Sequence, residues 1–174
     1  MAAAIILPFD MLITLMGELW LDESQRFSSL NHWQRFLLPT LGAASLGVVF
    51  HFMRVEDREV GIVHVLSRMR SHYGQLPLRN MLTQFLAGAF ALATGQSGGR
   101  EGPGVHLGAA ISSGLGHRLG LPDNSQRILI ACGTAGAISI AFDTPLAGVI
   151  FAIEVIVAEY TVVGFTPVIL AAVS

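Results

Sequence analysis

Apolar stretches separated by short polar or glycine-rich segments recur along this chain from one end to the other. The clearest stretch, residues 36–52, holds no Asp, Glu, Lys or Arg over about 17 residues, near the lower limit for crossing a bilayer. Gly42 and Gly47 within it would allow close contact with a neighbouring helix. This pattern predicts a helix that crosses a membrane.

Shorter apolar stretches on either side of that span predict further helices. Several hold only about 13 to 16 apolar residues, fewer than the roughly 20 of a straight membrane span. Short helices interrupted by glycine are typical of segments that end inside the bilayer, as in channels and transporters that place helix ends at an ion. The expected helices cover residues 2–21 (interpreted as a truncated first helix), 81–96, 105–119, 146–160 and 166–174, with another from the turn at 121–125 to 142.

Local signals mark where two of these helices begin. The polar turn at 121–125 ends in Asn124 and Ser125, either of which can cap the helix that follows. Further along, Thr144 is expected as an N-cap, because Pro145 after it suits the first helical position.

The segment 54–79 is more polar than its neighbours, and we interpret it as an amphipathic helix on the membrane surface. Its arginine excess favours the cytoplasmic side, since it carries half of the ten basic residues of the chain. Its apolar residues recur at a helical spacing. They are Val60, Val63, Leu66 and Met69, and the arginines are Arg54, Arg58, Arg68, Arg70 and Arg79.

Composition identifies the chain as an all-α, multi-pass integral membrane protein without a separate soluble domain. Hydrophobic residues make up 52% of it and charged residues 13%, where soluble domains carry about 25%. The net charge is −2 and no basic run could follow a phosphate backbone, which excludes nucleic acid as a partner. The single cysteine, Cys132, allows no internal disulfide and no multi-cysteine zinc site. No cofactor is expected.

The strongest candidate for chemistry is Glu101, in the glycine-rich loop 95–104 between two apolar stretches. An acid at membrane depth is a functional-site hypothesis in itself. Pro103 suits the start of the next helix, where free N–H groups and the helix dipole favour an anion. The carboxylate could occupy that anion site and vacate it when protonated, which would make a gate that responds to pH. The alternative is an interfacial loop with a solvated Arg100–Glu101 pair.

The histidines give weaker signals. His106, one turn into the helix after the loop, is interpreted as a packed, hydrogen-bonded histidine rather than a pore-lining group. The remaining histidines show no spacing that would make a metal site convincing. An enzyme is the least favoured class, because no nucleophile and base pair is recognisable.

Four motifs in this order resemble the CLC chloride channels and chloride/proton antiporters, of the bacterial type. The resemblance is strong over 81–174 and weaker over 36–52. The motifs are Gly99-Arg100-Glu101-Gly102-Pro103, Val105-His106-Leu107-Gly108-Ala109, Gly133-Thr134-Ala135-Gly136-Ala137 and the run from Pro145 to Val155 that begins Pro-Leu-Ala-Gly.

The resemblance implies chloride or a similar anion as the transported ion, with Glu101 as the gate. It implies that backbone amides around Arg100, Glu101 and Gly102 bind the anion. It also implies a homodimer, with helices in 146–174 at the subunit interface, in the bacterial inner (cell) membrane.

Two motifs depart from the family pattern. The Gly-Ser-Gly-Ile-Pro motif, whose serine helps bind the central chloride, is replaced by Arg-Glu-Val-Gly-Ile-Val at 58–63. Antiporters often carry two adjacent glutamates after Pro-Leu-Ala-Gly, and here that pair is Glu154–Val155. Glu154 is thus a candidate inner acid, although a satisfied helix acid near the interface explains it as well. Loss of the second glutamate favours anion conduction with weak or no proton coupling.

In extent, residues 1–174 correspond to the N-terminal half of the CLC transmembrane domain, which is built from two inverted halves. The chain is therefore either a fragment of a longer protein or a truncated product that needs a partner chain. The first hypothesis is an anion channel or transporter with Glu101 as gate, in which protons are a possible second ion. The alternative is a non-conducting subunit that associates with an intact relative.

Overall fold

The computed structural model describes residues 2–18, 30–157 and 162–173, and these form helices and no strand. The predicted all-α class is confirmed. In chain order the elements are α1 (Ala3–Glu18), α2 (His32–Phe52), the 3-10 helix η1 (Val55–Arg58), α3 (Gly61–Ser71), α4 (Leu78–Ala93), α5 (Glu101–Arg118), α6 (Asp123–Phe142), α7 (Pro145–Phe151), the π-helix η2 (Ala152–Val157) and α8 (Val162–Val173).

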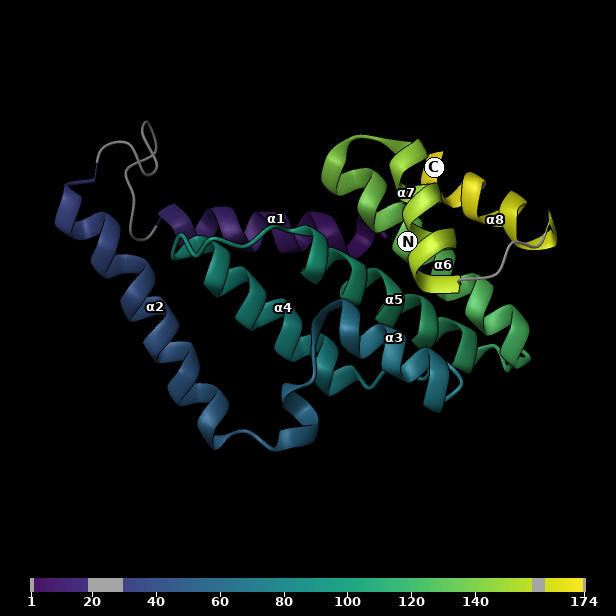
Figure 1. Cartoon of the computed structure of the whole chain (residues 1–174), viewed down its shortest axis with the longest axis horizontal. Coiled ribbons are helices and arrows are strands. Elements are labelled where there is room, and N and C mark those ends of the chain that lie inside the picture. The colour runs from purple at the N-terminus through teal and green to yellow at the C-terminus, as the bar shows by residue number, and fades with distance from the viewer. Residues whose placement is uncertain (1, 19–29, 158–161, 174) are drawn as a thin grey trace.

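Helices α5 and α6 form a hairpin against which most other helices pack, whereas α2 and η1 contact α4 (Figure 1). Helices α3 and α4 contact α5, whereas α7, η2 and α8 contact α6. Helix α1 runs across α4, α5 and α6, and its Phe9 ring lies 5.6 Å from the ring of Phe85 on α4. The α5–α6 hairpin thereby holds two groups of helices together.

Small residues allow the two central helices to approach closely. A Cβ atom added to Gly108 of α5 would overlap the backbone oxygen of Gly133 on α6, and one added to Gly133 would overlap Gly108 and Ser112. At Gly116, one turn beyond Ser112, an added Cβ atom would likewise overlap the Gln126 side chain of α6. Small residues at every fourth position are the usual means by which membrane helices pack backbone to backbone.

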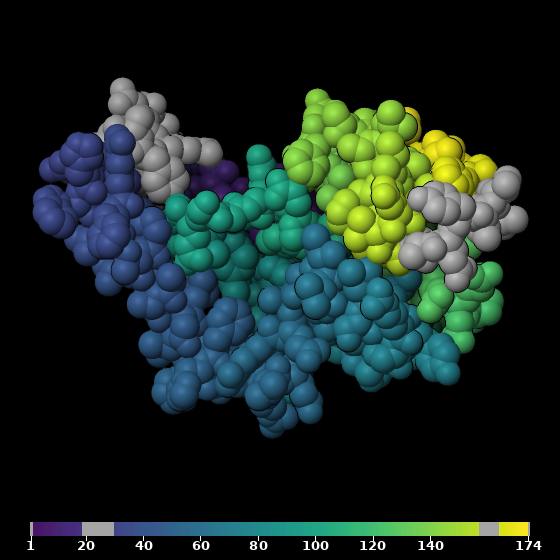
Figure 2. Space-filling model, viewed as in Figure 1, coloured from purple at the N-terminus to yellow at the C-terminus, as the bar shows by residue number. Residues whose placement is uncertain are grey.

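Helix α2 is the least buried of the long helices, and Gly42 is its single buried residue. Its start is fixed by a capping box, in which the Asn31 and Gln34 side chains exchange bonds with the backbone. Figure 2 shows α2, in blue, at the opposite end of the molecule from the yellow α8. By length and composition, α2 and α6 are both able to cross a membrane. The span predicted at 36–52 lies within α2.

The surface helix predicted for 54–79 is wrong in extent and in its buried face. That range is divided among η1, α3 and the first residues of α4. On α3 the buried residues are His64, Val65 and Met69, whereas Val63 is 78% exposed. Strict i, i+3 spacing moves the side chain about 60° backwards at each step, so residues 60 and 69 point to opposite sides of a helix.

The boundary signals are partly confirmed. Pro145 is the first residue of α7 and Thr144 occupies the N-cap position, although its side chain makes no capping bond. At α6, Pro122 is the N-cap, so the expectation that Asn124 or Ser125 caps this helix is wrong. The helix expected over 146–160 changes at Phe151 into the π-helix η2, and residues 158–160 lie outside the described residues.

Candidate functional site at the start of α5

The chain leaves α4 through a left-handed turn that returns it toward α2 and α5. Gly95 has a φ of +79°, a conformation that favours glycine. The N–H groups of Gly95 and Gln96 donate to Leu92 and Ala91, which closes the end of α4. This turn places the glycine-rich loop beside α4 and aims the next helix back across the molecule.

Helix α5 begins at Glu101, four residues earlier than the sequence predicts. The N–H of Gly104 donates to the Arg100 carbonyl at 2.8 Å, which closes the first turn. Pro103 has no N–H, and the N–H groups of Glu101 and Gly102 precede any intrahelical acceptor. The start of α5 therefore presents two amide donors without an intrahelical acceptor, together with the positive end of the helix dipole, and these features favour an anion.

The Glu101 side chain folds back over the loop that precedes it. A Cβ atom added to Gly99 would overlap the Glu101 carboxylate, so only glycine leaves room for it there. The side chain is half-buried, and no described residue gives its carboxylate a hydrogen bond or an ion pair. The Glu101 carboxylate thus lies at the helix start without a fixed partner among the described residues.

Arg100 does not pair with Glu101, contrary to the alternative considered from the sequence. Its guanidinium instead donates to the Asp10 carboxylate of α1 at 3.0 Å. This partly exposed ion pair joins the loop to α1 across 90 residues of sequence. The Asp10 carboxylate therefore engages the Arg100 guanidinium and offsets its charge.

A cavity of about 350 Å³ opens beside the loop, between α2 and α4. Two amide side chains in its wall, Gln84 and Gln96, are polar groups that sequence reasoning missed. Gln84 is buried within apolar α4, and the amide nitrogen of Gln96 has no hydrogen-bond partner among the described residues. Gly99 and Pro103 also line the cavity, so it reaches the start of α5.

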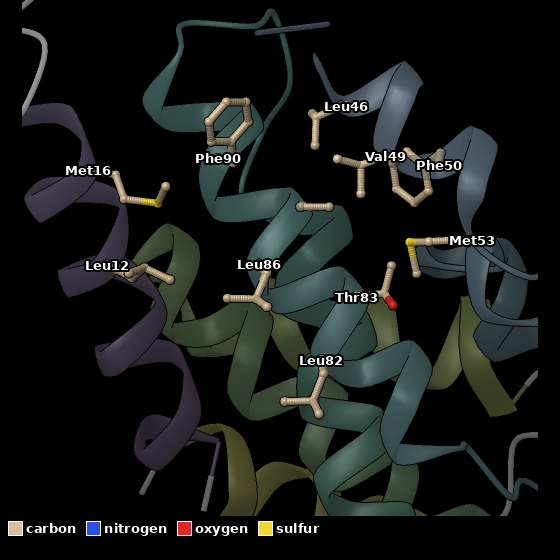
Figure 3. Close-up of a pocket in the computed structure, with 11 residues that line it drawn as sticks. Leu12, Met16, Leu46, Val49, Phe50, Met53, Leu82, Thr83, Leu86 and Phe90 are labelled. Carbon is tan, nitrogen blue, oxygen red and sulfur yellow. The ribbon is translucent and has the colours of Figure 1, made fainter. Parts of the chain in front are cut away.

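A second cavity, of about 490 Å³, lies between α1, α2 and α4 (Figure 3). Its wall is formed by aliphatic, aromatic and methionine side chains, with Thr83 as the single polar residue. This cavity therefore offers an anion a single polar side chain and no charged one.

Glu154, the candidate inner acid, lies on a different element from the loop. It is exposed on η2, whose main contacts are with α6 and α7. The following residue, Val155, packs against the apolar cluster formed mainly by α3, α5 and α6. Arg100, Glu101 and Gly102 thus lie together at the start of α5, and Glu154 belongs to another part of the molecule.

His106 is fully buried and hydrogen-bonded, as the sequence predicts, and its partner is His64 of α3. The His64 Nδ1 and His106 Nε2 atoms are 2.9 Å apart, and the ring centroids are 5.2 Å apart. The other ring nitrogen of His64 lies 3.7 Å from the Glu59 carboxylate. The pair could not be predicted from spacing, because 42 residues separate its members.

The family comparison decides the class of protein. The sequence model of the voltage gated chloride channel family matches residues 41–174. The chain belongs to this family. The match covers α2 from Leu41 onward and every later element, including the start of α5.

Individual chloride channel relatives support the same assignment. The chain is 30% identical over 150 residues to a ClcB-like chloride channel protein of Ralstonia nicotianae, an alignment covering 84% of this chain and 35% of that protein. It is 29% identical over 149 residues to the voltage-gated ClC-type chloride channel ClcB of Yersinia pestis, covering 84% and 36%. A chloride/fluoride channel protein of Pseudomonas syringae pv. tomato is 27% identical over 136 residues, covering 78% and 30%. The chain thus spans about a third of the length of the curated relatives it matches.

Proposed function

We propose that this chain forms part of a chloride pathway across a membrane, with Glu101 as its gate. The observation that carries the proposal is the Glu101 carboxylate, folded over Gly99 at the start of α5 without a described ion-pair or hydrogen-bond partner. Membership of the voltage-gated chloride channel family supports chloride, or a similar anion, as the ion that competes with it.

The gate follows from competition for one set of donors. An ionised carboxylate and a chloride ion both seek the amide groups of Glu101 and Gly102 at the start of α5, and like charges exclude each other. Protonation removes the negative charge of the carboxylate, and with it the attraction of the carboxylate to those donors. Anion flow should therefore rise as the pH falls.

The wider assignments are also proposals. Apolar side chains of α7 and α8, including Leu146, Ile150 and Leu170, are exposed, which suits a homodimer interface within 146–174. A multi-pass location in the bacterial inner membrane suits the two membrane-length helices and the family. Val155 stands where antiporters often have a second glutamate, so we propose that the path does not use that inner proton acid.

Replacement of Glu101 by Gln tests the gate. We expect chloride efflux from liposomes that rises on acidification for the wild-type chain and becomes independent of pH for Glu101→Gln. Glu56→Gln, a matched change of an exposed acid on η1, should keep the wild-type profile. A pH dependence that survives in Glu101→Gln would remove Glu101 from gating. Absence of efflux, together with capture of a full-length relative, would favour the non-conducting subunit.

A further inference from the structure

The His64–His106 pair is buried and polar, and its His64 end lies near an exposed side chain, that of Glu59. His64 is 4% exposed and His106 is fully buried, and they contact each other through Nδ1 and Nε2. On the outer side, the Nε2 of His64 faces Glu59, whose side chain is 61% exposed. On the inner side, the Nδ1 of His106 is buried without a hydrogen-bond partner among the described residues.

The outer carboxylate favours one arrangement of the protons on the two rings. The Glu59 carboxylate is an acceptor, so it favours the His64 tautomer with its proton on Nε2. The Nδ1 of His64 is then an acceptor, and the His106 Nε2–H must donate to it. The unpartnered Nδ1 of His106 therefore carries a lone pair and can take up a proton.

We propose that Glu59, His64 and His106 form a proton relay between the protein surface and the interior beside α5. A proton that reaches the Nδ1 of His106 binds there, the Nε2 proton of His106 moves to the Nδ1 of His64, the Nε2 proton of His64 moves to the Glu59 carboxylate, and Glu59 releases it to bulk water. One proton enters and one leaves, so the rings end neutral with their tautomers exchanged. Ring rotation, or transfer in reverse, restores them.

The outer gap fits this sequence of transfers. At 3.7 Å, the Nε2 of His64 and the Glu59 carboxylate are at ion-pair range and beyond hydrogen-bond length. Because the Glu59 side chain is mostly exposed, a change of rotamer or one bridging water closes the gap. The inner contact at 2.9 Å already has hydrogen-bond length.

Few charged groups act on the two histidine rings. Glu59 and Arg68, both on the α3 side, act on His64, and His64 acts on His106. Charged groups on the neighbouring elements have other surroundings. Arg79 of α4 and Glu154 of η2 are exposed. Arg127 of α6 donates to the Met69 carbonyl, Asp10 of α1 pairs with Arg100, and Glu101 of α5 folds over Gly99.

The purpose of the relay rests on the proposed function, whereas its chemistry does not. His106 follows Glu101 by five residues on α5, about 7.5 Å along the helix axis and about 140° around it. Its inner end therefore shares a helix with the proposed gate, and Val155 leaves that gate without the second glutamate of the antiporters. The relay gives the protein a route by which a proton passes between the surface at Glu59 and the interior beside α5.

Nitrogen NMR of the chain in lipid nanodiscs, with ¹⁵N-labelled histidine, tests the relay without any transport. We expect a scalar coupling between the nitrogens of His64 and His106 across their shared proton, and loss of it in His106→Gln. The coupling should persist in His117→Gln, which changes an exposed histidine of α5. Two uncoupled rings in the wild-type chain would overturn the relay.

Liposome measurements then separate the relay from the proposed function. Chloride efflux and proton uptake are recorded together for the wild-type chain, His64→Gln, His106→Gln, Glu59→Gln and His117→Gln. We expect loss of proton uptake with retained chloride efflux in both ring variants, slowed uptake in Glu59→Gln and no change in His117→Gln. Retained efflux shows that a variant is folded, and Glu59→Gln alters only an exposed side chain.

Each outcome of this pair of experiments has a separate meaning. Chloride efflux with no proton uptake in the wild-type chain, or uptake unchanged in both ring variants, would overturn the relay and leave the chloride pathway intact. Absence of chloride efflux from the wild-type chain would contradict the proposed function, and the nitrogen coupling would then decide the relay alone.

Discussion

Helices α2 and α6 have the same mean hydropathy and nearly the same length, yet their surroundings are opposite. In α2, 6% of the membrane-length segment is buried inside the protein, against 56% in α6. The difference lies in side-chain size, because α2 exposes Phe36 and Leu41 whereas α6 buries residues such as Gly133 and Ala137. Apolar content thus identifies a membrane helix, and small residues identify the one that packs against protein.

The largest expected effect comes from placing a charge on the exposed side of α2. Leu41 is 64% exposed near the middle of the helix, so Leu41→Arg would put a guanidinium into lipid. We expect membrane insertion of α2 to become less favourable by about 3–4 kcal/mol, while Leu41→Ala has little effect. The inserted fraction in microsomes, measured with glycosylation sites on both sides of α2, gives the difference. Equal insertion of the two variants would show that α2 does not face lipid.

A smaller effect is expected from enlarging a glycine of α6. Gly133→Leu would force side-chain atoms against the backbone of Gly108 on α5, and we expect a loss of about 1–3 kcal/mol in the free energy of unfolding. A Cβ atom added to Gly47 of α2 meets no atom within 4 Å, so the matched change Gly47→Leu should cost little. Denaturant titration in detergent measures both. A similar loss in the two variants would remove the distinction between the helices.

The smallest effect concerns Gly42, the buried residue of α2. Gly42 lies against the Thr94 side chain, and a Cβ atom there would overlap the Thr94 hydroxyl. We expect Gly42→Val to lower stability, with an energetic coupling to Thr94→Ala of about 1 kcal/mol in a double-mutant cycle. Additive effects of the two changes would mean that this contact does not hold α2 to α4.

The sequence predicts what depends on local pattern. Apolar length predicts the helix at 36–52, and Pro145 predicts the start of α7. The glycine-rich loop with a single acid was sufficient to select Glu101 as a candidate, because an acid beside helix-start signals is unusual at membrane depth. The resemblance to the chloride channel family rests on the same local motifs, and the family match confirms it.

The parts that could not be predicted depend on contacts between distant residues. The ion pair of Arg100 joins it to Asp10, and the partner of His106 lies on α3. The buried face of α3 follows from its packing against α5, whereas a strict three-residue spacing leads to the wrong face. In the sequence Gln84 is an ordinary polar residue, and the folded structure is needed to show that it lines the cavity beside the loop.

Competition between the Glu101 carboxylate and an anion for the start of α5 is most directly tested by chloride binding. Isothermal titration of the wild-type chain and of Glu101→Gln in detergent, at neutral and at acidic pH, compares chloride binding in the presence and in the absence of the competing carboxylate. We expect Glu101→Gln to bind chloride more tightly than the wild type at neutral pH, and the two affinities to converge on acidification. The same chloride affinity for both proteins at every pH would contradict the proposed gate.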